Sequence, residues 1–63
     1  MIDIIHRLPE VKTITGLSRS TIYELIRRNE FPQPVPLGLR AVGWIDSEIK
    51  AWLKERIASR VKH

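Results

Sequence analysis

The 63-residue chain carries 11 Lys and Arg residues against seven Asp and Glu residues, for a net charge of +4, and contains no cysteine. A chain of this length has room for one small domain, and without cysteine it has neither a disulfide nor a zinc–thiolate site to stabilise it. Its 43% of hydrophobic residues is too high for a disordered segment, so we expect a fold that rests on apolar packing or on a partner.

The charge balance favours one class of partner. A sequence pI of about 10.1 is typical of nucleic-acid-binding domains, although many small proteins are basic for solubility alone. No apolar run approaches the ~20 residues that a membrane span requires, and no secretory or lipidation signal is recognisable. We therefore expect a cytoplasmic protein without a membrane partner.

A first helix is predicted to begin near residue 8. Pro9 suits the first turn of a helix, where its missing N–H needs no partner, and Glu10 is favourable at a helix N-terminus. Gly16 is expected to end the helix in the left-handed conformation. One apolar face of this helix is formed by residues three apart, Leu8, Val11 and Ile14.

The segment before the helix, residues 1–7, alternates in polarity. This pattern predicts a short strand or a segment that becomes ordered on docking.

A second helix is predicted from Ser18, a good N-cap residue, to about Asn29. Its apolar stripe consists of Ile22, Leu25 and Ile26. Its outward face consists of Ser20, Tyr23, Glu24 and Arg27. The proline-rich run 31–36 cannot be helical and is expected to form an extended connector anchored by Phe31.

The last third of the chain predicts a hairpin followed by a helix. Residues 35–37 and 42–45 are expected to be short strands, with Gly38 taking a backbone angle at the tip that other residues avoid. Asp46 is predicted to cap the third helix. The apolar stripe of this helix consists of Ile49, Trp52, Leu53 and Ile57.

The two tryptophans and the two histidines each have a functional and a structural interpretation. Trp44 and Trp52 lie on apolar stripes, which favours core packing over stacking on nucleic-acid bases. His6 and His63 stand at opposite ends of the chain without a cysteine or carboxylate cluster, so we expect no metal site. No catalytic set and no glycine-rich phosphate loop can be assembled, and we expect neither an enzyme, a cofactor nor a small-molecule substrate.

The order of helix, tight turn, helix, hairpin and helix predicts a mainly α, small winged helix-turn-helix, with a two-stranded β-hairpin wing and a C-terminal helix. Residues 1–63 are expected to form one DNA-binding domain with a core at about residues 7–60. Since the major groove accepts a helix N-terminus with short polar side chains, the predicted DNA-contacting residues are Ser18, Arg19, Ser20, Thr21, Tyr23, Arg27 and Arg40.

Three residues on these surfaces have alternatives that the sequence leaves open. Tyr23 can pack half-buried instead of touching DNA, and Arg40 can be a plain surface charge at a hairpin tip. Glu24 would repel a DNA phosphate. It can accept a hydrogen bond from a cytosine amino group, or pair with Arg27 or Arg28.

Five runs occur in a specific order along the chain: Leu8-Pro9-Glu10-Val11, residues 15–23, residues 31–35, residues 40–44 and residues 48–53. Together they resemble the AlpA family of prophage regulatory proteins, within the MerR-like, excisionase-type winged helix-turn-helix group. The resemblance covers about residues 7 to 57. It implies a recognition helix at residues 18–29 and a wing at residues 37–44.

The resemblance also implies a location in the bacterial cytoplasm, associated with the nucleoid, and a function. We expect a sequence-specific, double-stranded DNA-binding transcriptional regulator of a prophage or other integrated element, acting at an integrase promoter. The alternatives are an excisionase-type directionality factor that bends DNA at an attachment site, or a protein-interaction module such as an antitoxin, because the fold alone does not decide. No long dimerisation helix is predicted beyond residue 60, so we expect a weak homodimer or copies on adjacent sites.

Overall fold

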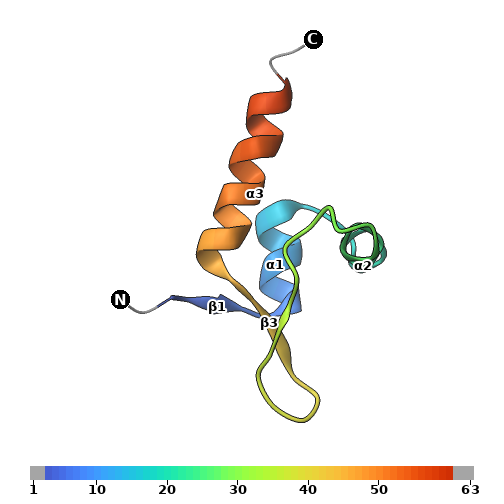
Figure 1. The fold of residues 1–63 in the computed structure, drawn as a ribbon, viewed down its shortest axis with the longest axis vertical. Helices are drawn as coiled ribbons and strands as arrows, with labels where there is room; N and C mark the ends of the chain where they lie inside the picture. Colours follow the sequence, from blue (N-terminus) through green and yellow to red (C-terminus); the bar gives the residue numbers. More distant parts are fainter. Residues whose placement is uncertain (1–2, 61–63) are drawn as a thin grey trace.

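The computed structural model describes residues 3–60 of the chain. Its elements follow in the order β1 (Ile5–His6), α1 (Leu8–Thr15), α2 (Arg19–Arg27), β2 (Val35–Pro36), β3 (Val42–Ile45) and α3 (Asp46–Ser59). This is the predicted mainly α winged helix-turn-helix, in which α1 and α2 form the helix-turn-helix and β2 and β3 form the wing. The hairpin tip and the C-terminal end of α3 lie at opposite ends of the long axis (Figure 1). None of the helices described is long and apolar enough to cross a membrane.

The turn between α1 and α2 is set by two residues, as the sequence predicts. Gly16 has a φ of 74°, in the left-handed region, and its N–H donates to the Lys12 carbonyl oxygen at 2.8 Å. A glycine reaches this conformation without the steric penalty that a Cβ would add. Ser18 then caps α2, because its Oγ accepts a hydrogen bond from the Thr21 backbone N–H at 3.2 Å. Together these residues end one helix and begin the next within three positions.

The buried core collects side chains from every helix, from the connector and from the central strand. Five buried hydrophobic residues form this core: Val11, Ile22, Phe31, Trp44 and Ile49. The predicted anchoring role of Phe31 is confirmed, and the Trp44 indole donates a hydrogen bond to the Pro32 carbonyl oxygen at 3.0 Å. That bond satisfies the indole N–H inside the core and holds the proline-rich connector against β3.

Two of the predicted apolar stripes extend further than the core does. Ile14, at the end of α1, is 41% exposed, and Ile57, in the last turns of α3, is 54% exposed. In Figure 1 the C-terminal half of α3 extends past the other helices, so no other helix or strand among residues 3–60 packs over this end. Ile14 and Ile57 thus lie on the predicted apolar stripes but outside the buried core, because a domain this small has too little facing surface to cover whole helices.

The sheet has three strands, with β3 in the centre and both pairings antiparallel. Ile5 lies opposite Ile45, and Val35 lies opposite Gly43. The N-terminal segment, predicted as a strand or a docking segment, thus adds a third strand to the hairpin. Gly43 permits this arrangement, since a Cβ at Gly43 would collide with the Ile5 side chain and lie 2.9 Å from Leu37 Cδ1.

Two predictions about the hairpin and α3 are wrong. Among residues 3–60, positive φ angles occur at Gly16 and Asn29, so Gly38 does not use the left-handed region at the hairpin tip. Ile45, not Asp46, is the N-cap of α3, and no side chain caps this helix end. Asp46 is the first helical residue, and its carboxylate is engaged by a distant part of the chain.

Candidate nucleic-acid interface

The N-terminal turn of α2 presents three hydroxyl groups and one guanidinium to solvent. The Ser18 hydroxyl donates to Thr21 Oγ1 at 3.0 Å while accepting the Thr21 backbone N–H, so both side chains are ordered by the cap itself. The residues of this turn are all exposed: Ser18, Arg19, Ser20 and Thr21. A helix N-terminus carries a partial positive charge and N–H groups that suit an anion such as a phosphate.

The next turn of α2 adds an aromatic group to the same exposed surface. The Arg19 guanidinium carbon lies 5.4 Å from the centre of the Tyr23 ring, within the range of a cation–π contact. Tyr23 retains substantial exposure, so its hydroxyl and part of its ring remain accessible to a ligand. The contact holds two of the predicted DNA-contacting side chains next to one another.

Two arginines at the C-terminal end of α2, the last helical residue and the C-cap residue, are bound by a single carboxylate. Glu24 Oε1 accepts a hydrogen bond from Arg27 Nη2, and Glu24 Oε2 accepts one from Arg28 Nε at 3.1 Å. The Arg27 contact, followed by that of Arg28, lowers the pKa of the Glu24 carboxyl below its ordinary value of 4.5. The sequence left open a pairing with Arg27 or Arg28, and the structure shows Glu24 paired with both.

Arg40 lies on the hairpin and is separate from this helical surface. The hairpin loop is closed by a hydrogen bond from the Leu37 N–H to the Ala41 carbonyl oxygen at 2.7 Å, and Leu39 and Arg40 are exposed at its tip. In Figure 1 α2 lies to the right of α1, whereas the hairpin extends below it. The structure thus gathers six of the seven predicted site residues at α2 and its N-cap and leaves Arg40 on the wing.

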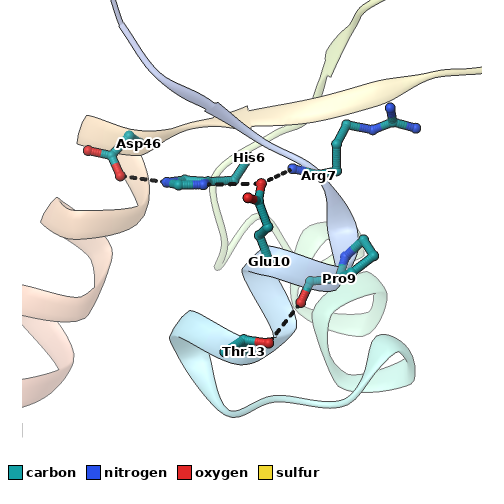
Figure 2. A network of polar contacts seen from close by, with 6 residues as sticks. All are labelled: His6, Arg7, Pro9, Glu10, Thr13 and Asp46. Carbon is teal, nitrogen blue, oxygen red and sulfur yellow. Dashed lines mark hydrogen bonds and ion pairs between the residues drawn. The ribbon is translucent and has the colours of Figure 1, made fainter.

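A polar cluster that the sequence did not predict joins β1, α1 and α3 (Figure 2). His6 Nε2 lies 2.6 Å from Asp46 Oδ1, and His6 Nδ1 lies 3.4 Å from Glu10 Oε1. Glu10 also accepts the Arg7 backbone N–H at 3.1 Å, and Lys50 Nζ lies 3.1 Å from Asp46 Oδ2. The cluster therefore fixes the start of both α1 and α3 relative to the N-terminal strand.

The electrostatics of this cluster favour an ion pair. The hydrogen bond to Asp46 is the main cause of a raised pKa at His6; burial works against it, and Glu10 adds a smaller increase. The pKa of Asp46 is lowered, first by His6 and then by Lys50. No group of three or more His, Cys, Asp or Glu side chains within residues 3–60 is placed to hold a metal ion. The other histidine, His63, lies outside the described residues.

The sequence carries only a weak local signal that could have predicted this cluster. His6 and Glu10 are four residues apart, but His6 precedes the helix, and Asp46 is 40 residues away from His6. Asp46 at a helix start is equally well explained as a cap, which is the role that the sequence favoured. Only the pairing of β1 with β3 brings the two side chains together.

Comparison with known proteins identifies the family. Residues 4–57 match the family model described as the prophage CP4-57 regulatory protein (AlpA). The chain is 59% identical over 54 residues to the uncharacterized protein ORF88 of enterobacteria phage P4, an alignment that covers 86% of this chain and 61% of that protein. It is 41% identical over 58 residues to the DNA-binding transcriptional activator AlpA of Escherichia coli strain K12, covering 82% of this chain and 83% of that protein.

The match to the family model takes in all six helices and strands of the fold except the last two residues of α3. The chain spans less than two thirds of the length of the phage P4 relative. Both relatives match over more than four fifths of this chain. The chain belongs to the AlpA family of prophage regulatory proteins.

Proposed function

We propose that this protein binds double-stranded DNA in a sequence-specific manner and regulates transcription of a prophage or other integrated element, at an integrase promoter. The observation that carries this proposal is the exposed surface of α2 with its N-cap: Ser18, Arg19, Ser20, Thr21, Tyr23 and Arg27. The E. coli relative, 41% identical, is named as a DNA-binding transcriptional activator, which supports the same function here.

The chemistry of this surface suits the major groove of DNA. The groove accepts an α-helix, and short hydroxyl side chains at the helix N-terminus approach phosphates and base edges closely. Ser20, Tyr23 and Arg27 follow at steps of three and four residues, so they share one face of α2. An arginine on such a face has the donors to bind guanine O6 and N7 together.

The wing supplies a second, weaker contact. The exposed Arg40 at the hairpin tip reaches the phosphate backbone or the adjacent minor groove when α2 enters the major groove. A single domain, with its core at about residues 7–60, makes all of these contacts. Because one copy offers few base contacts, we expect weak binding by a single copy and cooperative occupancy of adjacent sites.

The test begins with duplexes selected by the protein from a random-sequence pool, followed by salt titrations on a selected and a scrambled duplex. Affinity should fall steeply with salt because Lys and Arg side chains displace counterions from DNA. Arg27→Ala and Ser20→Ala should lower the ratio of selected to scrambled affinity, whereas Lys54→Ala on the exposed side of α3 should leave that ratio unchanged.

Two outcomes contradict the proposal. Salt-insensitive binding to a protein, with no affinity for duplex DNA, would instead indicate an interaction module. Unchanged affinity for the selected duplex in every α2 variant, with the fold intact by circular dichroism, would show that α2 is not the element that contacts bases.

A further inference from the structure

We propose that Glu24 is a positioning residue that fixes Arg27 and Arg28 on α2 and so increases discrimination between specific and non-specific DNA. This role rests on the proposed DNA-binding function. It follows from an unusual placement: Glu24 is the one acidic residue between positions 19 and 29, in the helix that carries the predicted DNA contacts.

The carboxylate is placed to hold two side chains at once. Arg27 and Arg28 follow Glu24 by three and four residues, so all three side chains lie on neighbouring turns of one face. Each carboxylate oxygen accepts from a different guanidinium, Oε1 from Arg27 and Oε2 from Arg28. A single ionised group therefore restricts the rotamers of two long side chains that extend into solvent.

The contact leaves Arg27 able to bind a base edge. A guanidinium has five N–H donors, and Arg27 meets Glu24 through Nη2. Its side chain is 77% exposed, so the remaining donors face solvent. Holding the guanidinium in one orientation before binding reduces the freedom lost when it pairs with guanine, because less side-chain motion remains to be frozen.

The same carboxylate weakens sequence-independent attraction. Phosphates repel Glu24, and they have to compete with it for the two guanidinium groups that it already binds. Non-specific binding depends almost wholly on such phosphate contacts, whereas specific binding also draws on base contacts. A negative charge at this position therefore reduces non-specific affinity by a larger factor than specific affinity.

Two substitutions at Glu24 separate orientation from charge. Glu24→Gln removes the charge at nearly constant shape, and Glu24→Asp keeps the charge on a side chain one methylene shorter, which cannot reach both arginines in the same way. Glu55→Gln is the matched control, because Glu55 is an exposed residue of α3 and its substitution makes the same change in net charge. Each variant is titrated on the duplex selected by the unsubstituted protein and on its scrambled version.

We expect Glu24→Gln to bind the scrambled duplex more tightly and to lower the ratio of selected to scrambled affinity roughly threefold or more, the scale of two exposed ion pairs. Glu24→Asp should lower the ratio too, although its charge is retained. Glu55→Gln should change both affinities by the same small factor. Circular dichroism checks that each variant is folded.

Two results would overturn this role while leaving DNA binding in place. The first is a ratio for Glu24→Gln equal to that of Glu55→Gln. The second is a ratio for Glu24→Asp equal to that of the unsubstituted protein. This result would show that Glu24 acts through its charge alone and does not orient the two arginines. If the unsubstituted protein selects no sequence and shows no salt-dependent affinity for duplex DNA, the proposed function fails, and the role of Glu24 fails with it.

Discussion

His6 Nε2 lies 2.6 Å from Asp46 Oδ1, and this contact joins the N-terminal strand to the first residue of α3 across 40 positions of sequence. The other ring nitrogen faces Glu10 in the first turn of α1, so the imidazole stands between two carboxylates (Figure 2). Both ring nitrogens donate only when His6 is protonated. The cluster is therefore strongest with a charged His6 and an ionised Asp46.

The first prediction concerns the pH dependence of stability. The pKa of His6 is raised above its ordinary value of 6.5. The protonated imidazole therefore stabilises the fold fully below pH 6.5, and this stabilisation is lost as pH rises through the raised pKa. The pKa of Asp46 is lowered from its ordinary value of 3.8. The ionised carboxylate therefore stabilises the fold above pH 3.8, and this stabilisation is lost as pH falls through the lowered pKa. Urea denaturation of the unsubstituted protein should show the free energy of unfolding declining as pH rises above the ordinary value of 6.5 and through the raised pKa of His6.

The control for this pH dependence uses both histidines of the chain. His6→Gln should flatten the decline on the alkaline side, because the ionisable ring is gone. His63→Gln should leave the decline as it is in the unsubstituted protein. A decline of the same size in His6→Gln would assign the pH dependence to another group.

Two glycine substitutions test the turn of the helix-turn-helix. Gly16→Ala places a Cβ at a left-handed position with a φ of 74° and should destabilise the domain by ~1–2 kcal/mol. Gly38→Ala is the control, because Gly38 does not use positive φ and a Cβ there meets no atom within 4 Å. Its effect in urea denaturation should stay within about 0.5 kcal/mol. Equal effects at the two positions would contradict the left-handed turn.

The two tryptophans should differ in their contribution to stability. Trp44 has no exposed surface, and Trp44→Ala should cost ~3–5 kcal/mol, enough to unfold a domain of this size. Trp52 is half-buried. The centre of its ring lies 4.8 Å from the centre of the Phe31 ring, and its indole N–H donates to the Glu30 carbonyl oxygen at 2.8 Å. Trp52→Ala should therefore cost less, about 2 kcal/mol, in the same denaturation measurement. A larger loss at Trp52 than at Trp44 would contradict this order.

Arg40→Ala tests the contribution of the wing. As a phosphate contact, Arg40 should strengthen binding to selected and scrambled duplexes alike, so its loss should weaken both by the same factor. The slope of log affinity against log salt concentration should become shallower by the amount that corresponds to the loss of about one phosphate contact. If Arg40→Ala changes only the selected duplex, the wing contacts bases instead.

The local signals of the sequence were sufficient for the helices and for the surface of α2. Gly16, Ser18 and Pro9 act through backbone sterics and hydrogen bonds within one or two turns, which depend on neighbouring residues alone. The shared face of Ser20, Tyr23 and Arg27 likewise follows from the periodicity of a single helix. For these features, the sequence by itself determined the outcome.

The tertiary structure decided the features that depend on what lies opposite a residue. Ile14 and Ile57 continue their apolar stripes but stay partly exposed, because the elements among residues 3–60 cover them only in part. Asp46 pairs with His6 instead of capping α3, because the register of β1 on β3 brings the imidazole to the helix start. Burial and long-range pairing are set by how elements are juxtaposed, and no periodicity within one segment contains that information.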